Sequence, residues 1–532
     1  MWSVIILYHE LDMLRKDLGV RKRAACADKA KHESGVDITW TENEFFVYDK
    51  LTPSIGHTQT IAEFQKKFKE AVTDWQSIYL VYVMLFFCGV QVTVFFTSMW
   101  PYLQALTPNA RVETFGICVA CFSLGQTIGS PVFGIYSSKT KSTKNPVCVG
   151  LCFVICGNFM YSLLPSVPDS MINSFMIFSR LLVGFGSGTT GVLRSYNATA
   201  CTQNDRKKVI STGIGALCIG ATLGPVIQII FNPLGGYNRK FLLFLTVNQF
   251  TAPAFVMCLF CLVSIIFFKL TFKETFIGIE ENDDISTENN KVEVPPFDKL
   301  AITICIFNWI CLQSMATNIE VLASPWTIAM YNWNDSEAIL YNGIILAMCS
   351  LTNFGNFMLQ AYSCIIKLDS RHLINFGLIA FIGYNVVNFP MFYSEKLDYI
   401  PLIENTTIEN TKLFGGCSRN FSWCESSNRI PLPVYIASMI ICLGMGFPSI
   451  SGPNGVVFSN CLGPRRQSGM QSMMEFFGCI ARGVGPLIIS ILFQMNGPLY
   501  CVIFQGIIML IALIMNIVFR NRLVPLTVKV RE

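Results

Sequence analysis

Charged residues are scarce in this 532-residue chain. Asp, Glu, Lys and Arg make up 14% of it, against roughly 25% in an ordinary soluble protein. Apolar residues make up 52%, and the mean hydropathy is +0.48. The small net charge of +5 is spread over short loops, so we expect no nucleic-acid partner. This composition is typical of a protein whose partner is the lipid bilayer.

Groupings of metal-binding and catalytic residues are also missing. The four histidines are His9, His32, His57 and His372, which do not cluster, so no metal site is predicted. The chain has no phosphate-binding loop, no nucleophile elbow and no paired catalytic carboxylates. The segment 186–191 matches a dinucleotide-binding pattern, but it lies in an apolar helical run, where small residues favour close helix packing. We therefore expect neither an enzyme nor a cofactor.

Apolar runs long enough to cross a bilayer recur along the chain. A span needs about 20 residues, because a helix rises about 1.5 Å per residue and the hydrocarbon core is about 30 Å thick. The sequence predicts twelve spans, at about 77–101, 114–136, 146–165, 174–200, 209–231, 242–268, 300–322, 338–365, 373–394, 431–460, 469–494 and 498–519.

Two stretches of the chain repeat one another 260 residues apart. Each holds a Gly-x-Gly, a basic pair and then a Gly-Pro, which follows the first glycine by 40 residues in one copy and 41 in the other. The repeated residues are Gly184, Gly186, Gly224 and Pro225, then Gly444, Gly446, Gly485 and Pro486. Internal duplication is typical of transporters. We predict an all-α membrane protein with twelve transmembrane helices in two pseudo-symmetric six-helix halves, 76–270 and 299–520.

Lysine and arginine are concentrated in alternate loops, around 139–144, 206–208, 367–371 and 465–466. Because positive residues prefer the cytosolic side, both termini are predicted to be cytosolic. Residues 1–75 then form a cytosolic tail, residues 271–298 an acidic cytosolic linker, and residues 521–532 a second tail. The amphipathic pattern at 60–72 predicts a short helix that packs on the protein body or, alternatively, lies on the membrane surface.

One long loop, 395–430, lies on the predicted non-cytosolic side. It holds Cys417 and Cys424, whereas the other 19 of the 21 cysteines fall in spans, at their edges or in the N-terminal tail, where they are packing residues. It also carries glycosylation sequons at Asn405 and Asn420. We predict a Cys417–Cys424 disulfide and glycans in an oxidising lumen. A third sequon at Asn197 falls within or below a span on the other side and is discounted.

Five ionisable residues fall inside the spans: Arg180, Arg194, Glu320, Glu475 and Arg482. Such groups are costly in a membrane unless they are paired or face water, so they mark either a transport pathway or structural ion pairs. Arg180 and Arg194 are 14 residues apart, which predicts one helix face and a separation of about 21 Å. Glu475 and Arg482 should also share a face. We expect Glu320 to pair with Arg180 when the luminal side is closed, and Arg482 is the strongest candidate for a purely structural role.

Several of these residues lie in motifs of a known family. Arg180-Leu-Leu-Val-Gly184-Phe-Gly186 resembles the fourth-span signature of the major facilitator superfamily, and Gly220-Ala-Thr-Leu-Gly224-Pro225 resembles its fifth-span motif. Ser130-Pro131-Val-Phe-Gly134 resembles the end of its second span. The Asp-Arg that usually follows is replaced by Ser137-Ser138-Lys139, so the standard cytosolic gate contact of the superfamily is not expected.

A narrower set of motifs resembles the lysosomal branch of that superfamily linked to neuronal ceroid lipofuscinosis. The motifs include Trp100-Pro101-Tyr102-Leu103-Gln104, Arg194-Ser-Tyr196 and Ala481-Arg482. The resemblance implies an endolysosomal membrane location and a chloride conductance. Tyr8-His-Glu-Leu11 and Tyr48-Asp-Lys-Leu51 fit tyrosine-based signals for sorting adaptors.

Three functions are compatible with the sequence. The first is an anion channel on a transporter scaffold, in which Arg180 and Arg194 attract chloride. The second is a proton-coupled secondary transporter of a small organic solute, with Glu320 and Glu475 as proton carriers. The third is a non-transporting membrane scaffold.

Overall fold

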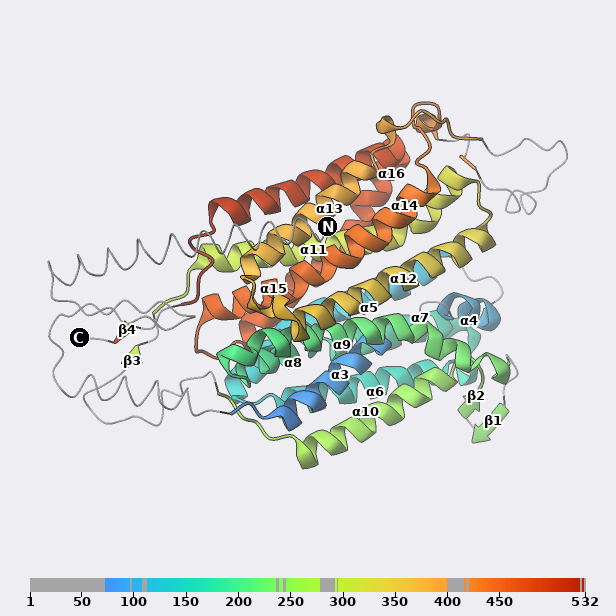
Figure 1. The fold of residues 1–532 in the computed structure, drawn as a ribbon. Helices are drawn as coiled ribbons and strands as arrows, with labels where there is room; N and C mark the ends of the chain where they lie inside the picture. The colour runs from blue at the N-terminus through green and yellow to red at the C-terminus, as the bar shows by residue number, and fades with distance from the viewer. Residues whose placement is uncertain are drawn as a thin grey trace, which may run out of the picture. The chain divides into compact units, whose positions relative to one another are not determined.

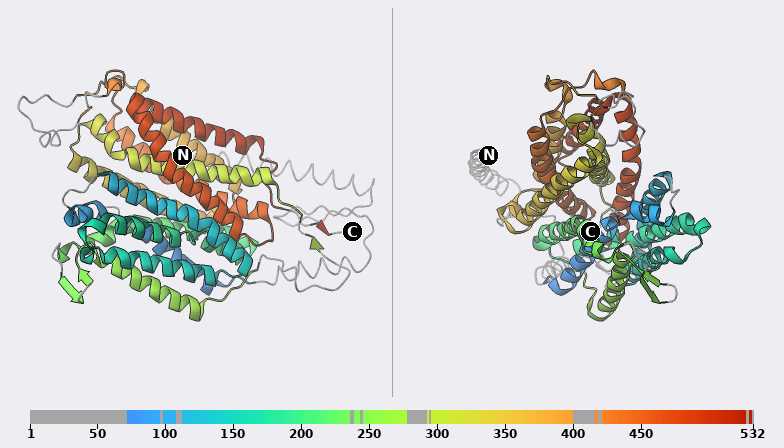
Figure 2. Two further views of the ribbon diagram at one scale, coloured as in Figure 1. Left: turned by 180° about the vertical axis from the view of Figure 1, so that it is seen from behind. Right: turned by 90° about the vertical axis from the view of Figure 1, so that its right-hand side faces the viewer.

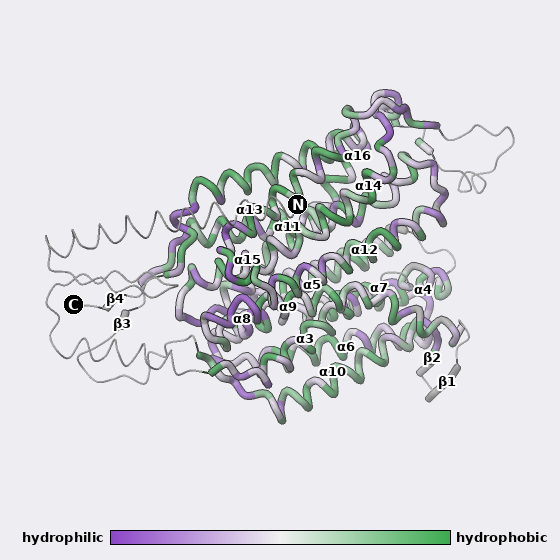
Figure 3. The backbone as a smooth tube through the Cα atoms, viewed as in Figure 1, coloured by the Kyte–Doolittle hydropathy of each residue, from purple (hydrophilic) through white to green (hydrophobic). Residues whose placement is uncertain are grey.

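The protein forms a bundle of long, nearly parallel helices (Figure 1). The computed structural model describes residues 72–95, 98–107, 112–235, 239–242, 245–277, 292–293, 295–399, 416–417, 421–526 and 529–530. The predicted helix at 60–72, the sequon residues Asn405 and Asn420, the Tyr8 and Tyr48 motifs and most of the linker lie outside these residues. Apolar residues run along the helices and polar residues gather toward their ends (Figure 3).

The first half of the chain is built of helices that follow the predicted spans. These are α3 (Trp75–Thr93), α4 (Met99–Leu106), α5 (Val112–Thr140), α6 (Lys144–Ser162), α7 (Ile172–Ser187), α8 (Thr190–Thr199), α9 (Gln203–Ile230) and α10 (Ala252–Thr271). The strands β1 (Arg239–Leu242) and β2 (Leu245–Val247) form an antiparallel hairpin between α9 and α10.

The second half has the same organisation. Its helices are α11 (Lys299–Tyr331), α12 (Asp335–Tyr362), α13 (Ser370–Val387), α14 (Leu432–Ser438), α15 (Gly444–Leu462) and α16 (Ser468–Val518). One π-helical turn, Met439–Leu443, joins α14 to α15. The short strands β3 (Val292–Glu293) and β4 (Lys529–Val530) pair antiparallel.

Within the described ranges, ten helices are long and apolar enough to cross a membrane. One of them, α16, is broken by non-helical backbone at Asn496 and Gly497 and therefore supplies two spans. The 18-residue α13 brings the number of spanning segments to twelve. The predicted all-α fold with twelve transmembrane segments is confirmed. Seen along the helices, the blue-to-green and yellow-to-red segments gather into two adjoining groups (Figure 2).

The repeated glycines lie where helices approach closely. A Cβ atom on Gly184 would lie 2.0 Å from the carbonyl oxygen of Phe122 in α5, and one on Gly446 would lie 2.6 Å from the ring of Phe381 in α13. No side chain fits at either place, so Gly184 allows backbone contact between α7 and α5, and Gly446 makes room for the Phe381 ring between α15 and α13. Pro225 and Pro486 lie inside α9 and α16.

The helical body has two ends, which we name by what they carry. The basic end holds the connections around Lys139, Lys207 and Arg465, and the disulfide end holds the Cys417–Cys424 disulfide. Next to that disulfide, Trp423 is 1% exposed and lies against the break in α16, where Gly497 has a φ of +58°. A Cβ on Gly497 would lie 2.4 Å from the Trp423 ring. The described part of the long loop is therefore anchored on the second half.

Candidate functional site

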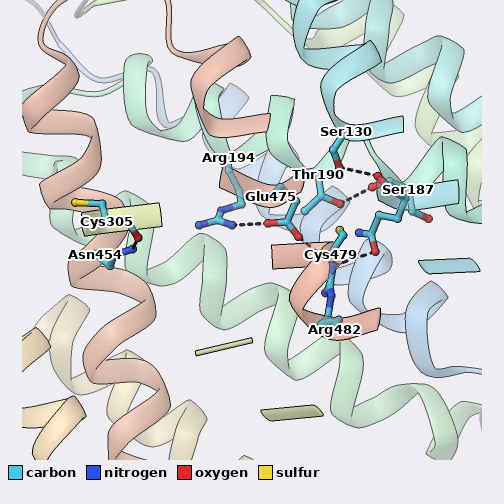
Figure 4. A network of polar contacts seen from close by, with 10 residues as sticks. Ser130, Ser187, Thr190, Arg194, Cys305, Asn454, Glu475, Cys479 and Arg482 are labelled. Carbon is cyan, nitrogen blue, oxygen red and sulfur yellow. Dashed lines mark hydrogen bonds and ion pairs between the residues drawn. The ribbon is translucent and has the colours of Figure 1, made fainter. Parts of the chain in front are cut away.

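Glu475 contacts arginines from both halves of the protein (Figure 4). Its side chain lies on α16, and the residue is 3% exposed. One carboxylate oxygen, Oε2, accepts a hydrogen bond from Nη1 of Arg194 in α8 at 2.8 Å. The other, Oε1, accepts from Nη2 of Arg482, two turns further along α16, at 3.2 Å. The prediction that Glu475 and Arg482 share a helix face is thus confirmed.

Arg194 is held from two sides. Its guanidinium carbon lies 4.2 Å from the centre of the Trp309 ring of α11, a cation–π distance, while Glu475 binds one of its nitrogens. Arg194 is 9% exposed. Trp309 and Glu475 both belong to the second half. The side chain of Arg194, which belongs to the first half, therefore packs between residues of the second half. A single sequence could not show this contact, because the partners are more than 100 residues apart.

Arg482 also connects the halves and is only half-buried. Its Nη2 donates to the amide oxygen Oε1 of Gln126 in α5 at 3.0 Å, and it lies 3.0 Å from the Sγ atom of Cys479. The contact between Gln126 and Arg482 was not predicted from the sequence. Arg482 therefore bridges α16 and α5, which is compatible with the structural role expected for it.

Hydrogen bonds between the halves run from the basic end to the middle of the bundle. Within the described residues, the two farthest apart are Ser138–Ser468 at the basic end, with hydroxyls 2.9 Å apart, and Gln126–Arg482. Gln126 lies 12 residues, or about 18 Å, from Ser138 along α5, close to the midpoint of that helix. Arg206 to Asn460 at 2.7 Å and Lys207 to the carbonyl of Ile366 at 3.0 Å lie at the basic end. The halves are therefore locked together at the basic end.

Arg180 lies on α7, in the half of the bundle toward the disulfide end, in surroundings unlike those of Arg194. Its guanidinium carbon lies 5.1 Å from each of the ring centres of Phe95 and Phe122, and the residue is 4% exposed. Two nitrogens, Nε and Nη1, are buried without a hydrogen-bond acceptor. A tighter turn at Gly188 and Thr189, with helical backbone angles, joins α7 to α8, and residues 169–199 form one candidate span, as predicted for 174–200. Among the described residues, the guanidinium of Arg180 has no carboxylate partner.

The predicted ion pair between Glu320 and Arg180 is not formed. Glu320 lies on α11 with an exposed side chain, and among the described residues it forms no ion pair. Arg180 instead lies between two phenylalanine rings of its own half. The pair was expected for a protein closed at the luminal side, whereas the hydrogen bonds of Ser138, Arg206 and Lys207 hold the halves together at the opposite, basic end.

The described part of the chain holds no grouping of His, Cys, Asp and Glu suited to a metal ion. Buried amide side chains form a hydrogen-bonded cluster that the sequence did not predict. Asn308, Asn454 and Asn516 form a buried cluster among α11, α15 and α16, with hydrogen bonds of 2.8 to 3.3 Å. Such amides satisfy one another without charge, so they hold helices at a fixed register.

Comparisons with known proteins agree with this architecture. The family model of the Major Facilitator Superfamily matches residues 74–398, more than half of the chain. "Major facilitator superfamily domain-containing protein 8" of Xenopus laevis is 28% identical over 467 residues, covering 83% of this chain and 90% of the relative.

Two solved structures share the fold. One is the human organic anion transporter MFSD10, with 14% identity, a TM-score of 0.58, and coverage of 83% of this chain and 99% of that one. The other is the proton:xylose symporter XylE, with 13% identity, a TM-score of 0.59, and coverage of 85% and 97%. With twelve helical segments in two halves and this family match, the chain belongs to the major facilitator superfamily of membrane transporters.

Proposed function

We propose that this protein conducts or carries small anions, chloride first among them, across the endolysosomal membrane. The observation that carries the proposal is Arg180, a buried guanidinium with two unpartnered nitrogens. Among the five charged residues of the spans, three are arginines and two are glutamates, which leaves one net positive charge (3 − 2 = +1). A pathway with surplus positive charge lowers the barrier for an anion and raises it for a cation.

The location rests on similarity to the Xenopus relative and on the lysosomal branch that the sequence motifs resemble. With both termini cytosolic, the basic end faces the cytosol and the disulfide end faces the lumen. The disulfide and the sequons at Asn405 and Asn420 then lie in the oxidising compartment, as glycosylation requires. Sorting adaptors would read the Tyr8 or Tyr48 motifs from the cytosol.

Patch-clamp recording of enlarged endolysosomes tests the proposal, with luminal chloride exchanged for gluconate. We expect a chloride-dependent current that Arg180→Gln abolishes and Arg180→Lys partly retains, because lysine keeps the charge. Arg371→Gln is the matched control, since Arg371 lies at the basic end and pairs with Asp369. A chloride current of normal size in Arg180→Gln, with normal protein levels, would overturn the role of Arg180.

A second candidate is a proton-coupled transporter of a small organic solute. It is favoured by Glu320, a carboxylate inside a predicted span whose side chain is exposed and forms no ion pair among the described residues. Proton-driven uptake of a labelled solute into proteoliposomes, lost in Glu320→Gln, would support this function. If no chloride current accompanied that uptake, the anion-channel proposal would be wrong.

A further inference from the structure

A group of lysines lies at the basic end of the first half, beside the helices α6 and α10. Two short segments supply it, the connection from α5 to α6 at 137–145 and the end of α10 with the residues after it at 269–274. We call these five residues the lysine cluster: Lys139, Lys141, Lys144, Lys269 and Lys273. The two segments contain one carboxylate, Glu274, so their net charge is +4 (5 − 1).

Hydrogen bonds hold the two segments together. The Nζ atom of Lys144 donates to the carbonyl oxygen of Lys269 at 2.8 Å. The Oε1 atom of Glu274 accepts from the hydroxyl of Ser142 at 2.8 Å and from the backbone N–H of Thr143 at 3.0 Å, just before α6 begins. Two parts of the chain that are 125 residues apart thus place their lysines around one junction.

Ion pairs do not neutralise this group of charges. Among the described residues, no ion pair is formed by four of its members, Lys139, Lys144, Lys269 and Lys273. At the same end of the second half, by contrast, Arg371 pairs with Asp369 and Arg522 with Asp298. Like charges gathered at one place repel one another, so the lysine cluster favours an anionic partner from outside the chain.

The place of the lysine cluster along the helices identifies that partner. The helix α10 packs on α6 and α3 and lies at the edge of the bundle (Figure 1). Its last turns before the cluster present large apolar side chains outward: Leu262, Ile266, Phe267 and Leu270, the last of them 78% exposed. In a bilayer these side chains contact acyl chains. The lysines that follow them therefore lie at the level of the lipid headgroups.

We propose that the lysine cluster binds the headgroup of an anionic phospholipid that carries additional phosphate groups, in the leaflet at the basic end. In the orientation proposed above, this is the cytosolic leaflet. Several lysines next to a membrane-spanning helix attract such headgroups, because each ammonium group is a point charge with three donors. The acyl chains of the lipid would cover the exposed side chains of α10. The proposal does not depend on the anion function, because the lipid stays in the membrane.

Native mass spectrometry of the purified full-length protein in detergent measures lipid binding without any transport assay. Phosphatidylinositol bisphosphate, phosphatidylserine and phosphatidylcholine with the same acyl chains are added in turn. We expect the bisphosphate lipid to bind at the lowest concentration and phosphatidylcholine at the highest. In a thermal-shift titration with the bisphosphate lipid, raising the salt from 0.1 M to 1 M should weaken binding, because the screening length falls from about 10 Å to about 3 Å.

Paired substitutions locate the site. Lys144→Gln with Lys269→Gln should weaken binding of the bisphosphate lipid about thirtyfold, since each lysine near a charged membrane surface contributes about one tenfold step or slightly less. Changing the same two residues to arginine keeps the charge and should retain most of the binding.

A second pair guards against misfolding. Lys139→Gln with Lys273→Gln should weaken binding similarly, and both side chains are exposed, so their substitution leaves the packing intact. The matched control is Lys299→Gln with Lys367→Gln, which removes two exposed lysines at the basic end of the second half. It should bind the lipid as the unsubstituted protein does.

Loss of binding in both cluster pairs, with the control unchanged, supports the site. Equal binding of the bisphosphate lipid and phosphatidylcholine overturns it, and so does an equal loss in the cluster pairs and the control. A soluble bisphosphate headgroup that binds as tightly as the lipid would indicate a site for free phosphate and overturn the assignment to a lipid.

The chain itself contains a competing partner, the acidic stretch of the linker. If the lipid binds only after Glu280, Glu281, Asp283 and Asp284 are changed to the corresponding amides, the linker and not a lipid is the partner of the lysine cluster, and the proposal is wrong. These results are independent of any chloride current, so the lipid site and the anion function stand or fall separately.

Discussion

At the scale of single residues, the buried arginines lie in two different environments. Arg194 and Arg482 share the carboxylate of Glu475, whereas Arg180 lies between aromatic rings and has no anionic partner in the described part of the chain. A buried ion pair adds little net stability, because desolvation offsets the attraction, but removing one partner leaves a buried charge exposed to the full penalty. The network of Arg194, Glu475 and Arg482 is thus sensitive to loss of Glu475, its one negatively charged residue.

Glu475→Gln should lower the free energy of unfolding by about 3 kcal/mol, the range found when one partner of a buried pair is removed. The reason is that Arg194 keeps its charge in a site that is 9% exposed. The double variant with Arg194→Gln should recover part of the loss. Thermal unfolding of the four proteins of this cycle measures the coupling, and strictly additive effects would show that the pair is not coupled.

Asp398, in the loop at the disulfide end, has a depressed pKa and therefore loses its contribution to stability only at acidic pH. Hydrogen bonds from Asn332 at 2.8 Å and Arg429 at 2.7 Å hold its pKa below the usual 3.8. A depressed pKa contributes stability that is present above the unfolded value and lost as pH falls through the folded one. Asp398→Asn should therefore lower the Tm equally at pH 7 and pH 5. A Tm difference that appears at pH 7 but not at pH 5 would show that Asp398 titrates between them.

At the scale of elements, the sequence predicted the helices well and their partners poorly. The predicted span 431–460 corresponds to α14 through α15, and the predicted boundary at Asn496-Gly497-Pro498 is the break in α16. Run length and glycine and proline positions are local signals, so they can be read from one chain. The predicted span 174–200 corresponds to α7 and α8, but the tighter turn at Gly188 and Thr189 between them was not predicted.

Partner choice was not predictable, because it depends on contacts between distant segments. Arg194 finds Glu475 281 residues away, and Arg180 is covered by Phe95 and Phe122 rather than by Glu320. Spacing along one helix correctly paired Glu475 with Arg482, since that relation is local.

Gly497→Ala tests the junction between the two spans of α16. The positive φ of +58° costs a residue with a Cβ about 1 kcal/mol, and that Cβ would also meet the fully buried ring of Trp423 at 2.4 Å. We expect a clear decrease in Tm and easier proteolysis of the loop. Gly343→Ala, where a Cβ meets nothing within 4 Å, is the control and should leave both unchanged.

At the scale of the whole molecule, polar contacts hold the halves together from the middle of the bundle to the basic end. The hydroxyls of Ser138 and Ser468 are 2.9 Å apart and mark the outermost of these contacts. A secondary transporter of this architecture works by moving one half against the other around a central site. A covalent bond at Ser138 and Ser468 should therefore trap this arrangement.

The double substitution Ser138→Cys with Ser468→Cys should form a disulfide under mild oxidation, detectable as a linked peptide pair by mass spectrometry. We expect oxidation to abolish coupled transport in proteoliposomes and reductant to restore it. Each single substitution serves as a control. A chloride current that persists after complete cross-linking would show that conduction does not require the halves to part at the basic end, as in a channel with a fixed pore.

α16 is attached at two places. Trp423 of the long loop packs against Gly497, and Glu475 binds Arg194 of the first half. From Gly497 to Glu475 the chain is helical apart from Asn496 and spans 22 residues, or about 33 Å. A helix of this length transmits displacement along its axis. A protein that binds the loop from outside therefore exerts force on α16, the same helix that carries the Glu475 carboxylate between Arg194 and Arg482. Force on the loop is transmitted through α16 to the network of Arg194, Glu475 and Arg482. An antibody that binds the loop would therefore affect this network without entering the membrane.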